Sequence, residues 1–148
     1  MSPLLKMETM KNDILIETSK ISKKIRGYSL NCKIGNNVRI DDDVVLKGKI
    51  IIKSNVHIAR GCTLSGGKKG IILENFSTLS NFCQIFTESD DYIKTTVSGG
   101  TLDHKTRKKF CKSYSKEVLI GKSVIVGPFS VILPGTTIGE FCTLGPYS

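Results

Sequence analysis

The chain has 148 residues, 39% of them hydrophobic, and its 22 Lys and Arg against 13 Asp and Glu give a formal net charge of +9. This length suits one domain with a buried core, and no apolar run is long enough to predict a transmembrane segment. The first twenty residues are too interrupted by charge for a secretory signal, so we expect a cytoplasmic protein.

Residues 1–30 do not share the repeat that follows them. Their larger apolar residues fall near helical spacing: Met7, Met10, Ile14, Ile21 and Ile25. This spacing predicts a short N-terminal helix or an irregular cap over the end of the domain that begins at residue 31.

A six-residue period dominates residues 31–148. Stepping by six, with two restarts, meets only Ile, Leu or Val: Ile34, Ile40, Leu46, Ile52, Ile58, Leu64, Leu73, Leu79, Ile85, Ile120, Val126, Ile132, Ile138 and Leu144. Four positions after each of these residues, the chain mostly carries a small or β-branched residue. Glycines and prolines recur just after the large apolar residue, which excludes a helix and suits tight bends between very short strands. The pattern predicts an all-β fold, a parallel β-helix of hexapeptide repeats whose triangular coils close about every 18 residues.

The period also assigns residues to three faces and marks two interruptions. Counting from Ile34, the first, second and third inward residues of each coil lie on faces one, two and three. The segment "SGGKKG" (65–70) predicts a small bulge at a corner. The excursion at about 91–117 leaves face three and returns to face one, so it is a long loop of functional interest.

The basic residues gather in this loop, within "HKTRKKFCKSYSK" (104–116). The segment lacks a recognition helix or spaced stacking aromatics, so we predict no nucleic-acid partner. The five cysteines are odd in number and form no C-x-x-C pair, which favours reduced thiols over a disulfide framework or a zinc site.

Two stretches resemble a known enzyme family. "VLIGKSVIVGPFSVILPGTTIGEFCTLG" is similar to the final coils of the hexapeptide-repeat acyltransferases, and "NVHIARGCTLSGGKKGIILENFSTLSNFCQIFTESDDY" resembles their sugar O-acetyltransferase branch, related to maltose and galactoside acetyltransferases. The resemblance covers residues 31–148. It implies a left-handed β-helix, a homotrimer, and acetyl transfer from acetyl-CoA to a sugar hydroxyl or amino group in polysaccharide or glycan biosynthesis. The acceptor would be a sugar, a nucleotide-sugar or an oligosaccharide.

The resemblance also implies where the acceptor reacts. Asp90 stands about where maltose and galactoside acetyltransferases carry a catalytic histidine. His57 is expected to point outward from a strand end, as a general base should, and we expect it to lie apart from Asp90 within one chain. Our hypothesis is that His57 is the base and that Asp90 or Asp91 of a neighbouring subunit orients it. Ser89, Asp91 and Tyr92 are expected sugar contacts. A carboxylate acting alone as the base is a weaker alternative.

For the cofactor, the resemblance places the pantetheine arm of acetyl-CoA along the last coils, near Gly127, Pro128, Gly145 and Pro146. No metal is expected, because a carbonic anhydrase site of this fold needs three histidines and the chain has two. Two alternatives to this prediction stay open. In one, the protein is a catalytically weak or inactive β-helix scaffold or assembly subunit; in the other, it is a serine acetyltransferase, although that family's long helical N-terminal domain is absent here.

Overall fold

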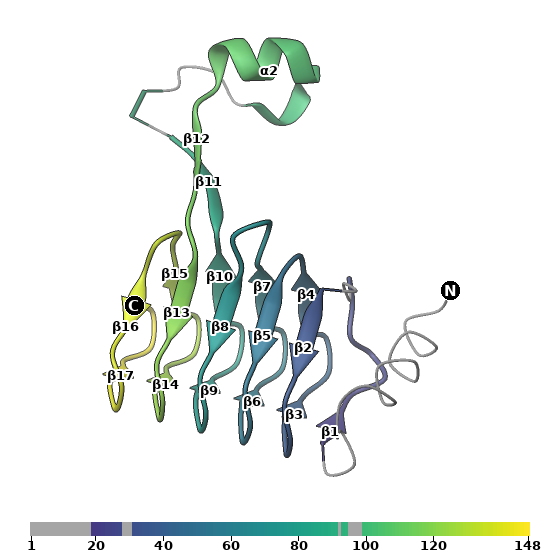
Figure 1. The fold of residues 1–148 in the computed structure, drawn as a ribbon, viewed down its shortest axis with the longest axis vertical. Coiled ribbons are helices and arrows are strands. Elements are labelled where there is room, and N and C mark those ends of the chain that lie inside the picture. Colours follow the sequence, from purple (N-terminus) through teal and green to yellow (C-terminus); the bar gives the residue numbers. More distant parts are fainter. Residues whose placement is uncertain (1–18, 28–30, 92, 95–98) are drawn as a thin grey trace.

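The computed structural model describes residues 19–27, 31–91, 93–94 and 99–148. In these residues the chain winds into stacked coils, and three parallel β-sheets run along the stack (Figure 1). A two-stranded antiparallel sheet and one short α-helix stand away from the coils. The predicted hexapeptide-repeat parallel β-helix is confirmed.

Successive coils supply strands to the three sheets, which we name after the predicted faces. The face-one sheet contains β2 (Cys32–Ile34), β5 (Ile50–Ile52), β8 (Ile71–Leu73), β13 (Val118–Ile120) and β16 (Thr137–Ile138). The face-two sheet contains β1 (Lys20–Ile21), β3 (Arg39–Ile40), β6 (His57–Ile58), β9 (Thr78–Leu79), β14 (Ile125–Val126) and β17 (Thr143–Leu144). The face-three sheet contains β4 (Val45–Lys47), β7 (Thr63–Ser65), β10 (Gln84–Phe86) and β15 (Val131–Ile132).

The inward residues stack in register, as the period predicts. On face three, for example, Leu46 pairs with Leu64, Leu64 with Ile85, and Ile85 with Ile132. All members of the fourteen-residue column are buried except Leu144, which packs against the core from the last coil. Parallel strands lie about 4.8 Å apart, so equivalent side chains of neighbouring coils touch and form one continuous apolar core.

The corners use a backbone conformation that the sequence reasoning did not anticipate. At most corners the residue three places after the inward apolar residue has positive φ, and at five of them it is aromatic: Phe76, Phe82, Phe129, Phe141 and Tyr147. Three of these, Phe82, Phe129 and Tyr147, stack along one edge with ring centroids 5.2 and 5.1 Å apart; we call them the aromatic ladder. Positive φ strains a bulky residue, so contacts such as this stacking must offset the cost.

Gly61 lies at the foot of the ladder and also has positive φ, +72°. A Cβ atom there would come within 2.4 Å of the Phe82 ring. Glycine is therefore required at this corner both for the backbone conformation and for the space that Phe82 fills.

The described N-terminal segment extends the solenoid. β1 pairs in parallel with β3, Arg26 bridges to Val45, and Ile25 is buried in the core. Residues 19–27 thus add a partial coil against the first full one. The rest of the predicted helix or cap, with Met7, Met10 and Ile14, lies outside the described residues.

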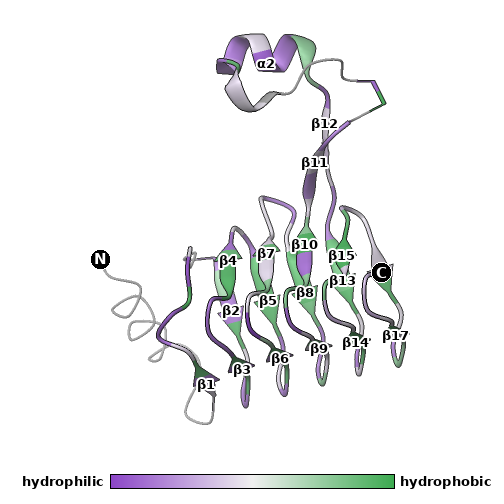
Figure 2. Cartoon of the chain, turned by 180° about the vertical axis from the view of Figure 1, so that it is seen from behind, coloured by the Kyte–Doolittle hydropathy of each residue, from purple (hydrophilic) through white to green (hydrophobic). Residues whose placement is uncertain are grey.

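The long excursion leaves face three after β10 and returns to face one at β13, as predicted. We call residues 88–115 the arm. It contains β11 (Glu88–Asp90) paired antiparallel with β12 (Ser113–Ser115), the 3₁₀-helix η1 (Gly99–Thr101) and the helix α2 (His104–Phe110). At its base the Lys116 N–H donates to the Thr87 carbonyl at 2.9 Å. Figure 2 shows hydrophilic residues over β11 and much of α2, and no residue of α2 is buried.

Candidate functional site

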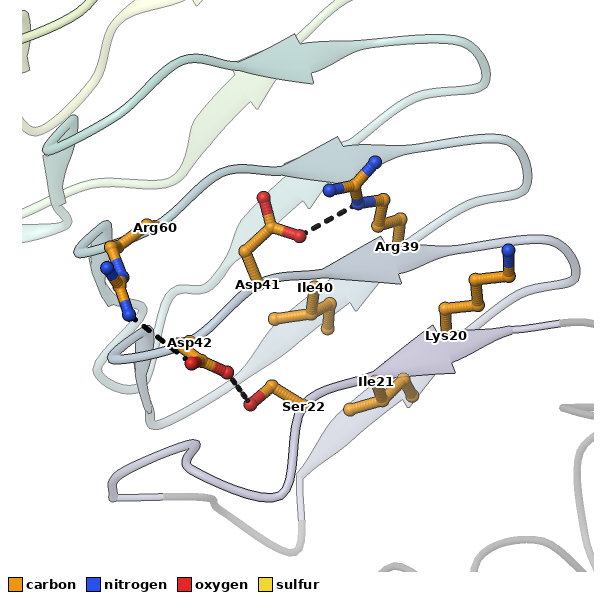
Figure 3. Close-up of a pocket in the computed structure, with 8 residues that line it drawn as sticks. All are labelled: Lys20, Ile21, Ser22, Arg39, Ile40, Asp41, Asp42 and Arg60. Carbon is orange, nitrogen blue, oxygen red and sulfur yellow. Dashed lines mark hydrogen bonds and ion pairs between the residues drawn. The ribbon is translucent and has the colours of Figure 1, made fainter.

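His57 lies on β6 of the face-two sheet and points outward, as predicted, with 35% of its side chain exposed. Its Nε2 atom is 3.0 Å from Oδ2 of Asp41, which follows β3 in the preceding coil. The guanidinium of Arg39 donates from Nε to the other carboxylate oxygen at 2.8 Å (Figure 3). Asp41 therefore orients the imidazole within one chain.

The pKa of the Asp41 carboxyl lies below its ordinary value. Partial burial acts to raise this pKa, but the hydrogen bonds from His57 and Arg39 and their positive charges outweigh the desolvation. The carboxylate is thus ionised at neutral pH. An ionised partner stabilises an imidazole that takes up a proton, which is what a general base requires.

A shallow hollow of about 480 Å³ lies beside Asp41 on the face-two sheet (Figure 3). Lys20, Arg39 and Arg60 supply positive charge to it, and Asp41 and Asp42 supply negative charge. Asp42 accepts a hydrogen bond from Ser22 and pairs with Arg60 at 3.3 Å. Most of the charged groups in this hollow are therefore already paired.

Asp90 lies in the arm, on the opposite side of the coils from β6 (Figure 1). It lines a polar cavity of about 390 Å³ together with Glu88, Ser89, Arg107, Ser113, Tyr114 and Ser115. The Arg107 Nη2 atom lies 3.5 Å from Asp90 Oδ1. His57 and Asp90 are thus apart within one chain, as predicted.

The predicted sugar contacts separate in the structure. Ser89 lines the arm cavity beside Asp90. Asp91 is not among the lining residues and instead accepts hydrogen bonds from the backbone N–H groups of Ile93 and Lys94, at 3.1 and 3.2 Å. Its side chain therefore shapes the turn after β11. Tyr92 lies outside the described residues.

The four residues predicted to lie near the cofactor come together at the corner between the face-two and face-three sheets. Gly127 and Pro128 follow β14, and Gly145 and Pro146 follow β17 in the next coil. A Cβ atom on Gly127 would lie 2.6 Å from the backbone of Gly145 and Pro146, so the two bends are in close contact. The aromatic ladder borders the same corner.

Sequence reasoning missed two residues of these sites, Asp41 and Arg107. Asp41 could have been found, because the coil register that pairs Arg39 with His57 places Asp41 diagonally beside that histidine. Arg107 had no such signal. Its position depends on the hairpin of the arm and on α2, which no repeat specifies.

None of the five cysteines forms a disulfide. Cys32, Cys62 and Cys83 are buried in the core, and burial raises the pKa of Cys32 to about 12. In the part of the chain that the structure describes, no three His, Cys, Asp or Glu side chains gather as metal ligands, and no helix is long and apolar enough to cross a membrane.

Comparison with known proteins points to one enzyme family. The family model for bacterial transferase hexapeptide, six repeats, matches residues 31–66 and 117–148. A dTDP-4-amino-4,6-dideoxy-D-glucose acyltransferase of Escherichia coli is 32% identical over 136 residues, which cover 89% of this chain and 68% of that protein.

Solved structures of AntD, an N-acyltransferase from Bacillus cereus, are also similar. AntD in complex with dTDP and 3-hydroxybutyryl-CoA is 33% identical with a TM-score of 0.82, over 95% of this chain and 74% of AntD. An AntD variant with a substituted serine, in complex with dTDP-4-amino-4,6-dideoxyglucose and coenzyme A, matches with a TM-score of 0.81. This match covers 75% of the AntD chain. These relatives are an acyltransferase named for an amino-sugar nucleotide and an N-acyltransferase, so they do not support the predicted relation to the maltose and galactoside O-acetyltransferases.

Proposed function

Because the chain belongs to the hexapeptide-repeat acyltransferases, we propose that it transfers an acyl group from an acyl-CoA to the amino group of a dTDP-linked 4-amino-4,6-dideoxy sugar. The observation that carries the proposal is the likeness to AntD, which runs over 95% of the chain at 33% identity. Acetyl-CoA is the expected donor. AntD with 3-hydroxybutyryl-CoA makes a longer acyl group the second donor to test.

The reaction needs an uncharged amine. Its nitrogen attacks the thioester carbonyl carbon, a C–N bond forms, the C–S bond breaks, and the sulfur of coenzyme A leaves as a thiolate. The amine must lose a proton on the way, and that proton can finally neutralise the thiolate. A nearby base therefore increases the rate by removing the proton as the bond forms.

His57 is the base we propose. Its Nε2 atom is held by Asp41, so its Nδ1 atom is left to take the proton from the amine. The carboxylate assigned to orient His57 changes from Asp90 of another chain to Asp41 of the same chain. This leaves Asp90 for the acceptor, where its carboxylate pairs with the ammonium form as the amino sugar binds. That form loses one proton to water to give the uncharged amine before the nitrogen attacks, and His57 takes the second proton as the C–N bond forms.

A further correspondence supports the role of Asp90. Solved variants of AntD carry substitutions at a serine and at an aspartate ten positions later. Ser80 and Asp90 have the same residue types and the same spacing here. Ser80 follows β9 on the His57 side of the coils, whereas Asp90 is in the arm. A site that uses His57, Ser80 and Asp90 must therefore combine two chains, which we expect in the predicted homotrimer.

The proposal is tested by incubating the purified protein with dTDP-4-amino-4,6-dideoxyglucose and either acetyl-CoA or 3-hydroxybutyryl-CoA. Mass spectrometry should detect the N-acylated nucleotide sugar. The analogue with a hydroxyl group at C4 is the matched control and should remain unmodified. If neither coenzyme A nor the nucleotide sugar binds and nothing is acylated, the proposal fails and the scaffold alternative is favoured.

A further inference from the structure

Among the described residues that line the arm cavity, Arg107 is the one cation, and it faces Asp90. The two side chains come from different elements, α2 and β11, and their charged atoms are 3.5 Å apart. About half of the Arg107 side chain and a third of the Asp90 side chain are exposed, at 52% and 35%. A ligand can therefore reach both side chains. Because water screens the ion pair between Arg107 and Asp90, a charged ligand can take the place of either partner.

The rest of the cavity provides hydrogen-bonding groups. Ser89, Ser113, Tyr114 and Ser115 line it with hydroxyls, and its volume of about 390 Å³ is within the usual range for small-molecule sites. Among the described residues, the Ser115 hydroxyl is buried without a hydrogen-bond partner. A buried hydroxyl in that state is costly unless a ligand or water satisfies it. The cavity thus suits a sugar ring.

We infer that Arg107 selects the acceptor by exchanging ion pairs: Asp90 gives up Arg107 for the ammonium group of the amino sugar, and Arg107 takes the diphosphate of the same molecule. This rests on the proposed function and assigns a specificity role to a residue of α2. No covalent step is involved.

The exchange follows from the charges in the cavity. A ligand that binds only one of the two protein charges leaves the other to water, which costs little because both side chains are partly exposed, so dTDP alone gains the contact with Arg107 but not the exchange. A nucleotide-linked amino sugar carries both an ammonium group and a diphosphate, so both protein charges gain a new partner. Guanidinium and phosphate form bidentate, charge-assisted hydrogen bonds, which makes arginine well suited to this role. A neutral sugar offers no such exchange.

The test measures dTDP affinity by calorimetry for the wild type, Arg107→Gln, Arg107→Lys and Lys108→Gln. dTDP has no sugar and no amine, so it reports only on the phosphate contact. Arg107→Gln should weaken dTDP binding by about 10- to 100-fold, the range for a hydrogen bond to a charged group. Arg107→Lys should bind dTDP with an affinity between those of the wild type and Arg107→Gln. Lys108→Gln, a matched change on the same helix, should stay within about twofold.

Steady-state kinetics supply the second readout. Arg107→Gln should raise the KM for the amino-sugar nucleotide and leave the KM for acyl-CoA unchanged. If Arg107 only holds Asp90 in place, the Arg107→Gln and Lys108→Gln variants will bind dTDP with the same affinity. In that case the inference is overturned while the proposed function stands. If the wild type binds neither dTDP nor the amino-sugar nucleotide, the acceptor class is wrong and both fail. Because no residue of α2 is buried, the variants should fold, and circular dichroism checks this.

Discussion

At the scale of single residues, the surroundings of His57 fit the general base that we propose. Arg39 and His57 both bind the Asp41 carboxylate, which follows the strand adjacent to β6. The backbone of β6 is held by its parallel neighbours β3 and β9. A base on a rigid strand, oriented by a carboxylate, loses little entropy when it meets the acceptor.

The first prediction concerns this base. His57→Ala should lower the rate of acyl transfer by about 10²- to 10⁴-fold, the usual contribution of a positioned acid or base. His104→Ala is the matched control and should keep the wild-type rate, because His104 begins α2 and does not line the arm cavity. The rates are measured by chromatography of the acylated nucleotide sugar. A folded His57→Ala protein with full activity would remove the histidine from the mechanism.

The second prediction concerns pH. The pKa of Asp41 is lower in the folded chain than its ordinary value, so the folded state binds this proton more weakly than the unfolded state. The stability that Asp41 contributes is therefore fully present above about pH 4 and is lost as the pH falls through the lowered pKa. Urea unfolding should show Asp41→Asn less stable than the wild type at pH 7, with the difference narrowing toward pH 3. A difference that widens on acidification would contradict this.

At the scale of elements, the aromatic ladder stabilises corners that are strained by positive φ. Phe129 stacks on both Phe82 and Tyr147, so it is the central member. Phe141 also has positive φ at a corner and is 70% exposed, but no stacked partner is found for it among the described residues. The two positions therefore separate the effect of stacking from that of the backbone.

The third prediction uses this difference. Phe129→Ala should lower the free energy of unfolding by about 1 to 3 kcal/mol, the sum expected for two aromatic pairs. Phe141→Ala should change it by no more than about 0.5 kcal/mol, as is usual for exposed positions. Urea denaturation followed by circular dichroism measures both. Equal losses at the two positions would show that the ladder contributes no stacking energy.

We expect that the solenoid folds without the arm. Its helix buries no residue, and its two ends meet where the Lys116 N–H bonds the Thr87 carbonyl at 2.9 Å. The fourth prediction is that replacing residues 88–115 by a short glycine-rich turn leaves the β-helix folded, with a thermal midpoint within a few degrees of the wild type. Acyl transfer should be lost, because Asp90 goes with the arm. Unfolding of the shortened protein would show that the arm supports the coils.

At the scale of the whole molecule, the opposite placement of His57 and Asp90 has a consequence for assembly. The last coils also expose apolar side chains on their outer surfaces, including Ile125, Val131 and Leu133 at 47–49%. Exposed apolar groups of this kind favour contact with another chain. Both observations agree with the expected homotrimer, in which the base of one chain would face the arm of the next.

The fifth prediction tests this shared site. His57→Ala and Asp90→Asn should each be inactive alone, whereas co-expression of the two variants should restore part of the activity. Mixed trimers contain some interfaces at which an intact His57 meets an intact Asp90. Light scattering establishes that the mixture is trimeric. Activity that stays absent in mixed trimers would mean that each site lies within one chain.

The repeat of the sequence was enough to predict the coils, their three faces and the inward column, from Ile34 to Leu144. This is because each hexapeptide specifies its own strand and bend, and coils of equal length place equivalent residues above one another. The same register would have found Asp41 beside His57. It could not predict the positive φ of the corner aromatics, because a phenylalanine does not favour that conformation by itself.

The sequence by itself therefore determined the solenoid, the position of its long excursion and the outward placement of His57. Only the tertiary structure decided how the excursion folds. The arm folds back through a hairpin and places Arg107 against Asp90, 17 residues earlier in the chain, while Asp91 turns away to cap its own loop. No period links these residues, because their positions follow from the pairing between β11 and β12 and from the helix α2 that connects the two strands.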